Sequence, residues 1–181
     1  MANIQHADRD RLMAAVTELL HAVGEDPNRE GLLETPRRVA DMYLEVFSGL
    51  DEDPRLHIDS AIFNEPGGGE LVTVADITFD SMCEHHLLPF RGTVDITYAP
   101  SEGRVVGLSK LARVVETVAR RPQVQERMTR DILAAIAESS LKPQGVSVEV
   151  QAEHMCMAIR GIRKPGAITR TAQYWGSLAS G

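Results

Sequence analysis

Two short clusters hold both cysteines of this 181-residue chain, and the clusters lie far apart in the sequence. The first runs from Cys83 to His86, and the second includes His154 and Cys156. Because Cys83 and His86 are three positions apart, one turn of the chain can direct both side chains at one point. Cys156 can supply a third ligand only if the fold brings the clusters together. One imidazole and two thiolates suit zinc, so the sequence predicts a metal site that a compatible fold must assemble.

The residues beside these ligands leave several interpretations open. Unpaired cysteines are often buried as small apolar side chains, which would need no metal. If a metal is present, His85 or His154 could complete a closed structural site with four protein ligands. In the third interpretation both histidines stay spare and the fourth position is open to water, as in a catalytic zinc site. Neutral imidazoles beside an activated water favour hydrolysis.

The composition predicts one domain, or one domain with an appendage, in a cytoplasmic protein. Hydrophobic residues make up 43% of the chain but aromatic residues only 4%, so the core must be mainly aliphatic. The formal net charge of −7 argues against general nucleic-acid binding, although a local basic pocket for a small anion stays compatible with it. Two cysteines do not make a disulfide framework. We see no apolar run typical of a signal peptide or a membrane span.

Two amphipathic helices are expected near the N-terminus. Asp8 is a suitable N-cap for the first helix, whose apolar residues recur at helical spacing. Thr35 and Pro36 mark the start of the second helix, as a capping hydroxyl followed by a proline at the first helical position. Residues 51–69 are acidic and rich in proline and glycine, so we expect a loop there.

After this loop the pattern changes to mixed β-structure and helix. The expected elements, in chain order, are strands at 71–79, 91–98 and 105–107, helices that begin at Ser109 and Pro122, a strand at 146–153, an extended segment at 155–160 and a last strand from Ile168. Apart from the short segment 105–107, the order is ββααββ. This order predicts an α+β fold in which two helices cover one face of an antiparallel four-stranded sheet. We therefore divide the chain into an N-terminal helical region with its linker, residues 1–69, and an α+β domain, residues 70–181.

Strand alternation predicts which side chains share a surface with the second cluster. If residues 154–160 are extended, every second side chain points to the same side. His154, Cys156 and Arg160 would then place a proton carrier, a metal ligand and a guanidinium together.

A helix start offers a candidate anion site. Ser109 and Lys110 lie where free backbone N–H groups favour an anion, and Arg113 follows one turn later. The same charges equally fit a solvated helix surface, and Glu126 fits an ordinary surface carboxylate. A triphosphate is a plausible ligand, but composition does not identify it.

Five segments together make the chain similar to a known family. They are residues 30–40, 81–90, 107–113, 121–127 and 153–163. In this order, across residues 10–170, they resemble the motifs of GTP cyclohydrolase I. Five long motifs in the right order are very specific, far more so than any one of them alone.

The resemblance implies a fold and an activity. The family has a tunnelling-type fold with the ββααββ order and assembles into a toroidal decamer, with active sites where subunits meet. Its members hydrolyse GTP to 7,8-dihydroneopterin triphosphate and formate, the first step towards folate and pterins. The implied cofactor is Zn²⁺ and the implied substrate is GTP, with no nucleic-acid or membrane partner.

The same resemblance implies roles for individual residues. Cys83, His86 and Cys156 are expected to hold zinc, with the fourth position left to water. His85 and His154 are expected to move protons as the imidazole ring of guanine opens and formate leaves. The expected substrate-binding residues are Glu126, with Gln125 beside it, for guanine, and Ser109, Lys110, Arg113, Arg160 and Arg38 for the triphosphate.

Two departures from the family pattern affect these expectations. Asp41 stands where some members carry a basic residue near the triphosphate, so either one phosphate contact is missing or that contact was never general. Near the C-terminus, Tyr174 and Trp175 replace small residues, and no helical tail follows. Two alternatives therefore stay open: a specialised paralogue that acts on GTP for a secondary pathway, and a non-catalytic nucleotide-binding subunit with a structural zinc.

Overall fold

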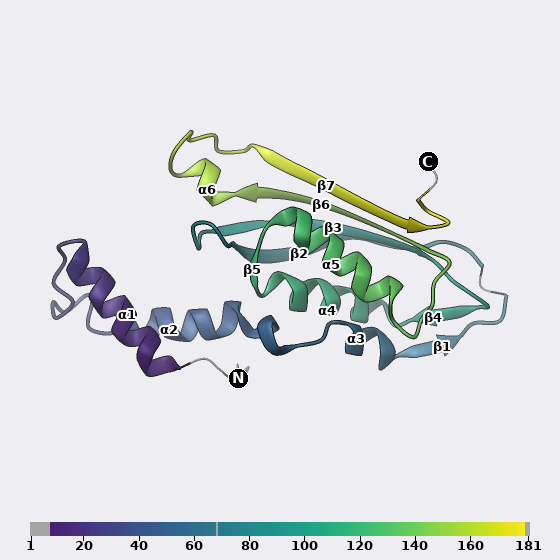
Figure 1. Cartoon of the computed structure of the whole chain (residues 1–181), viewed down its shortest axis with the longest axis horizontal. Coiled ribbons are helices and arrows are strands. Elements are labelled where there is room, and N and C mark those ends of the chain that lie inside the picture. The colour runs from purple at the N-terminus through teal and green to yellow at the C-terminus, as the bar shows by residue number, and fades with distance from the viewer. Residues whose placement is uncertain (1–7, 68, 180–181) are drawn as a thin grey trace.

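The structure, a computed structural model, describes residues 8–67 and 69–179 and has a mixed α+β fold (Figure 1). The helices are α1 Arg9–Ala22, α2 Thr35–Val46, the 3-10 helix η1 Ser48–Asp51, α3 Arg55–Asp59, α4 Leu108–Ala119, α5 Gln125–Ala137 and α6 Met155–Ala158. The strands are β1 Ile62–Asn64, β2 Val72–Cys83, β3 Pro89–Ala99, β4 Arg104–Val106, β5 Pro122–Gln123, β6 Gly145–His154 and β7 Ile168–Gly176. Within the described ranges, no helix combines the length and apolar character needed to cross a membrane.

The main sheet has the strand order β5-β2-β3-β6-β7. Its four long strands are antiparallel, whereas the two-residue β5 pairs in parallel with the end of β2. Helices α4 and α5 cover one face of this sheet (Figure 1). The α+β class is therefore confirmed, and the sheet has one short strand more than the sequence predicts.

The core between the sheet and the two helices is mainly aliphatic, as the composition predicts. The alternating apolar residues of β6 point into it, and the helices contribute one apolar stripe each. Aromatic side chains in this cluster come from Phe79, Phe90 and Tyr98. The fully buried aliphatic residues include Val146 and Val148 from β6, Leu111, Val114, Val115 and Val118 from α4, and Ile132 and Ile136 from α5.

The predicted loop at residues 51–69 is partly wrong, because it contains α3 and β1. Strand β1 pairs with β4 in a separate two-stranded sheet, so β4 does not belong to the main sheet. Ile58 of α3 is fully buried, and α3 packs against α4. The Tyr98 hydroxyl accepts a hydrogen bond from the Val106 N–H at 3.2 Å, which fixes β4 to the core. The domain boundary near residue 69 stays a prediction.

Three helix starts differ from the expected ones, and one agrees. Asp8 caps α1 as predicted, because its carboxylate accepts a hydrogen bond from a first-turn N–H at 3.0 Å. Thr35 and Ser109 lie inside their helices and make no side-chain cap. The helix expected from Pro122 begins at Gln125, because β5 pairs with β2 first.

The segment predicted to extend beyond β6 is helical instead. Strand β6 is paired with β3 only as far as His154, because β3 begins at Pro89. On its other side β6 is paired with β7 as far as Glu153. Without a neighbouring strand the backbone must find its hydrogen bonds locally, and Met155–Ala158 forms the single turn α6.

Helices α1 and α2 form a hairpin that projects from the body of the molecule (Figure 1). Val16 and Ala40 are buried between them. The Arg9 guanidinium donates to both carboxylate oxygens of Asp41, at 2.7 and 3.0 Å. Asp41 therefore has a structural partner within its own chain.

We predict that Gly92 tolerates no side chain. Gly92 lies in β3, and a Cβ there would overlap the carbonyl oxygen of Gln151 and lie 2.7 Å from the Cα of Ala152. Gly92→Ala should lower the free energy of unfolding by about 1–3 kcal/mol or more, as overpacked sites do. Urea unfolding measures this loss. Gly69→Ala is the control, because its Cβ would meet no atom within 4 Å; equal urea midpoints for the two variants would contradict the prediction.

Candidate metal centre and active site

The three predicted metal ligands converge at one end of the main sheet. Cys83 is the last residue of β2, His86 lies in the turn that leads to β3, and Cys156 lies in α6 directly after β6. Because β3 is paired between β2 and β6, the end of β2 and the end of β6 lie at the same end of the sheet. One ligand atom from each of the three side chains lies within 4.8 Å of the others.

The chemistry and spacing of these donors fit zinc. Tetrahedral zinc, with bonds of about 2.3 Å to sulfur and about 2.0 Å to nitrogen, keeps its ligand atoms about 3.5–3.8 Å apart. Cys83 Sγ lies 4.0 Å from Nδ1 of His86. Burial, and then the neighbouring sulfur of Cys83, raise the pKa of the Cys156 thiol. A divalent cation between the sulfurs would oppose that increase and stabilise both thiolates.

Backbone hydrogen bonds define the turn that carries the first two ligands. The Cys83 N–H donates to the Leu88 carbonyl at 2.9 Å, and the Cys83 carbonyl accepts from the Leu87 N–H at 2.8 Å. Leu87 has a φ of 50°, so the chain reverses tightly there. The Glu84 N–H donates to the Gln123 carbonyl at 3.0 Å, which holds the turn against β5.

An ion pair fixes the same turn to helix α5. The Arg127 guanidinium donates to both carboxylate oxygens of Glu84, at 2.5 and 3.0 Å. These hydrogen bonds hold the pKa of Glu84 below its usual value. Sequence analysis assigned no role to this pair. Its signal in the sequence was the carboxylate of Glu84 between two expected ligands, which does not by itself indicate a partner.

His154 is held rigidly beside the metal cluster. Its ring stacks on Phe90, with ring centres 4.5 Å apart and planes 3° apart. Its Nε2 lies 2.8 Å from Oε1 of Gln125. Burial lowers the pKa of His154, and the opposing charge of Glu126 only partly offsets this effect. Burial therefore favours the neutral form of this imidazole.

His85 is the opposite case, because its side chain is 64% exposed. Its Nδ1 lies 4.0 Å from Cys83 Sγ, and its Nε2 lies 3.9 Å from Glu84 Oε1. Its ring centre is 6.3 Å from that of His86. The two spare histidines thus lie near the same cluster, one open to solvent and one fixed by the core.

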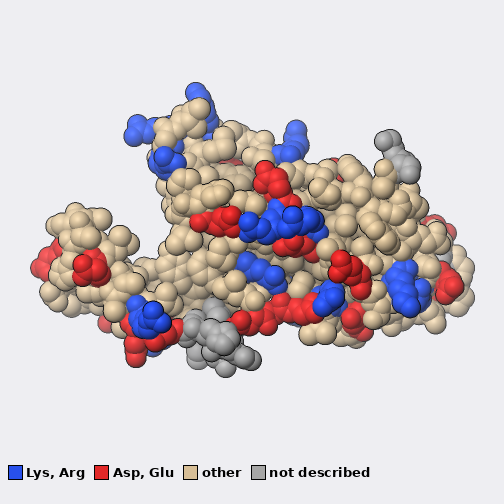
Figure 2. All heavy atoms as spheres, viewed as in Figure 1, with Lys and Arg blue, Asp and Glu red and all other residues tan. Residues whose placement is uncertain are grey.

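Arg160 lies beside the metal ligands, as predicted, but the predicted strand alternation over residues 154–160 is wrong. Residues 155–158 are helical, so strand alternation does not apply to them. Instead the turn after α6 brings Nη1 of Arg160 to 3.0 Å from Nε2 of His86. Figure 2 shows Lys and Arg side chains gathered around this turn, which also contains the exposed residues Arg163 and Lys164. An acidic chain therefore has a local basic surface next to the metal ligands.

The two residues expected at guanine have different environments. Glu126 is exposed in the first turn of α5, and its charge acts on His154. Gln125 is 1% exposed, and its side-chain amide is hydrogen-bonded within the chain to Val150, Thr169, Thr171 and His154.

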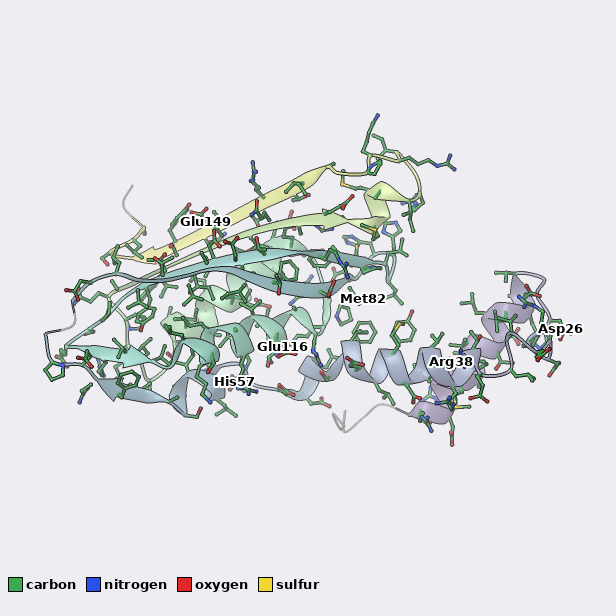
Figure 3. The ribbon with its side chains drawn as sticks, turned by 180° about the vertical axis from the view of Figure 1, so that it is seen from behind. Asp26, Arg38, His57, Met82, Glu116 and Glu149 are labelled. Carbon is green, nitrogen blue, oxygen red and sulfur yellow. The ribbon has the colours of Figure 1, made fainter. Side chains whose placement is uncertain are left out.

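The residues expected to bind the triphosphate lie apart from the metal ligands within this chain. Ser109 and Arg113 line a cleft of about 860 Å³ between α2, β2 and α4, together with Glu116 (Figure 3). Helix α4 rises about 1.5 Å per residue, so Ser109 lies about 15 Å from the end of the helix that leads to β5 and Cys83. Arg38 lies on the projecting helix α2 (Figure 3).

The sequence profile of the GTP cyclohydrolase I family matches residues 12–180. The chain belongs to this family.

Individual members of the GTP cyclohydrolase I family cover most of the chain. The protein named GTP cyclohydrolase 1 in Bacillus subtilis (strain 168) is 57% identical over 169 residues, which span 93% of this chain and 87% of that protein. The protein of the same name in Geobacillus kaustophilus (strain HTA426) is 60% identical over 157 residues, spanning 87% of this chain and 82% of that protein. Among solved structures, the archaeosine synthase QueF-Like in its apo form has a TM-score of 0.46 at 17% identity, and the match covers 60% of this chain and 95% of that chain. This similarity is too low to define the fold.

We predict that Arg127 supports metal binding without being a ligand. Arg127→Met removes the hydrogen bonds that fix the ligand turn, so zinc affinity should fall about 10-fold or more, as for other groups that orient metal ligands. Competition with a fluorescent chelator measures this affinity. Arg130→Met is the matched control, because Arg130 is an exposed residue of the same helix that pairs with the neighbouring Asp131 at 3.4 Å, away from the ligand turn. Equal affinities for both variants would rule out this role.

Proposed function

We propose that this protein hydrolyses GTP to 7,8-dihydroneopterin triphosphate and formate, as the first step of pterin and folate biosynthesis. Its membership of the GTP cyclohydrolase I family supports this activity. The observation that carries the proposal is the convergence of Cys83, His86 and Cys156 beside His154 and Glu126. That arrangement combines a metal centre, a neutral base and a carboxylate in one place.

The proposed cofactor is a zinc ion held by Cys83, His86 and Cys156. Two sulfurs and one imidazole nitrogen are zinc donors, and their spacing is compatible with one ion. When bound, zinc supplies Lewis-acid activation of water at neutral pH. His85 and His154 stay outside this donor set and are free to move protons.

The side chains around the proposed metal transfer protons and bind guanine. His154, neutral and fixed on Phe90, takes up and returns a proton as the imidazole ring of guanine opens. His85, whose exposed ring lies 4.0 Å from Cys83 Sγ, gives or takes a proton as formate leaves. The carboxylate of Glu126 accepts hydrogen bonds from the N–H donors on the polar edge of guanine.

Binding of the triphosphate needs several cationic side chains, and most of the expected ones lie far from the metal ligands of the same chain. Arg160 lies beside His86, but Ser109, Lys110 and Arg113 lie at the far end of α4, and Arg38 lies on the projecting hairpin. We infer that a neighbouring subunit supplies these residues, so that each active site forms where subunits meet.

The sheet edges support such an assembly. Among the described residues, β7 is paired only with β6, and β2 has a partner on its outer side only at its last two residues. Both edges therefore offer backbone groups to another strand. We infer a tunnelling-type fold that closes into a toroidal homodecamer by pairing these edges. A cytoplasmic location is consistent with a site built from two thiols, because reducing conditions keep thiols free.

Turnover of GTP tests the proposed activity. The purified, zinc-loaded protein should release formate and form 7,8-dihydroneopterin triphosphate in equal amounts. Cys83→Ser should abolish both products by removing a ligand. Tight GTP binding without formate, in a zinc-loaded and intact oligomer, would instead support a non-catalytic nucleotide-binding protein and would reject the proposal.

Mixed oligomers test whether neighbouring subunits share a site. Lys110→Ala and His154→Ala should each keep only a small residual activity alone, which for His154→Ala is about 100- to 10,000-fold below that of the wild type. When the two variants are co-assembled in equal amounts, about one quarter of the shared sites should carry both native residues, and activity should return to that extent. Lys110→Ala mixed with Arg113→Ala is the control and should regain nothing, because both residues come from the same helix. No recovery in the first mixture would contradict sharing of the site.

A further inference from the structure

The side chain of Gln125 is a buried connection between strand β7 and His154. Gln125 is the first residue of α5 and is 1% exposed. Its Nε2 lies 3.1 Å from the Val150 carbonyl, 3.2 Å from the Thr169 carbonyl and 3.1 Å from the Thr171 hydroxyl. Its Oε1 lies 2.8 Å from Nε2 of His154. Every polar atom of this amide therefore has a partner within the chain.

The partners determine which way the amide points. The carbonyls of Val150 and Thr169 can only accept hydrogen bonds, so the NH₂ group of Gln125 must face them. The reverse orientation would place an oxygen against two oxygens and leave buried groups unsatisfied. The amide oxygen of Gln125 therefore faces His154.

This orientation determines the tautomer of His154. An amide oxygen only accepts, so Nε2 of His154 must carry the hydrogen that it receives. A neutral imidazole has one N–H, and the other nitrogen, Nδ1, then holds the lone pair. Stacking on Phe90 holds the His154 ring parallel to the Phe90 ring, in the orientation that directs Nε2 at Gln125.

Further contacts hold Gln125 itself in place. The Thr129 hydroxyl donates to the Gln125 carbonyl at 2.8 Å and lies 2.7 Å from the Thr171 hydroxyl. Helix α5 and strand β7 thus form one hydrogen-bonded unit behind the histidine. The buried amide directs its NH₂ group at β6 and β7 and its oxygen at His154, so it does not present these groups to guanine.

We propose that Gln125 is a positioning residue that holds His154 as its Nε2–H tautomer, so that Nδ1 is the atom that takes up and returns the proton. Strand β7 takes part through the Thr169 carbonyl and the Thr171 hydroxyl. This role rests on the proposed function, in which His154 carries a proton, and it replaces the expected contact between the Gln125 side chain and guanine.

A double-mutant cycle separates positioning from substrate contact. Gln125→Leu should lower kcat for formate release about 10- to 100-fold, since general acid–base catalysis contributes about 100- to 10,000-fold in total. The KM for GTP should change by less than about two-fold, because no substrate contact is lost. In the His154→Ala background, Gln125→Leu should change kcat by less than about two-fold, because the group that it positions is already gone. Equal fold losses in both backgrounds, or a loss confined to KM, would overturn the proposal.

Two further variants keep the test decisive. Gln151→Leu also removes a side-chain amide from the sheet, but that amide donates to the Thr93 hydroxyl at 3.1 Å instead of to a group of the site, so kcat should stay at the wild-type value. If Gln125→Leu loses zinc or its oligomeric state, Thr171→Val replaces it in the cycle. This variant keeps the side-chain shape and removes one partner of the amide. Its kcat loss should likewise disappear in the His154→Ala background, and persistence of the loss would reject the positioning role.

Failure of the proposed function gives a different result. A wild-type protein that releases no formate from GTP rejects the activity itself. A wild-type protein that releases formate, combined with additive losses in the cycle, rejects only the role of Gln125.

Discussion

Strand β3 pairs Phe90 with Ser81 of β2 on one side and with His154 of β6 on the other. The rest of the site depends on this register, because it brings the two ends that carry the metal ligands to the same end of the sheet. It also places the Phe90 ring against the imidazole of His154. A shift by one residue would turn these side chains to the opposite face, which would separate the ligands and expose the core.

Helix α5 also positions several groups of the same site. Its first three residues reach three different parts of the site. Gln125 contacts His154, Glu126 is the exposed carboxylate expected at guanine, and Arg127 holds the turn between the metal ligands. Movement of this helix would therefore affect the base, the proposed guanine contact and the ligand turn together. Strand β7 supports it through Thr171, so the unusual C-terminal sequence with Tyr174 and Trp175 still completes the structure behind the site.

Sequence periodicity predicted the elements that have a strong local signal and failed where partners decide the structure. The α+β class, the Asp8 cap and the alternating strand β6 follow from local patterns. By contrast, α6 forms because β3 ends, and β5 forms because Pro122 meets the end of β2. The Cys83–His86 spacing predicted a shared turn, but only long-range pairing brings Cys156 to it. No local pattern indicated that Gln125 is buried or that Arg127 holds Glu84, because both roles need partners distant in sequence.

X-ray absorption at the zinc edge of the purified protein tests the central claim most directly. If Cys83, His86 and Cys156 hold the ion, the spectrum should give two sulfur atoms at about 2.3 Å, one imidazole nitrogen at about 2.0 Å and one further light atom that is not an imidazole. His85→Ala and His154→Ala should leave this spectrum unchanged. A zinc coordination shell without sulfur, or with two imidazoles, would contradict the assignment of the three ligands and the exclusion of His85 and His154 from the ligand set.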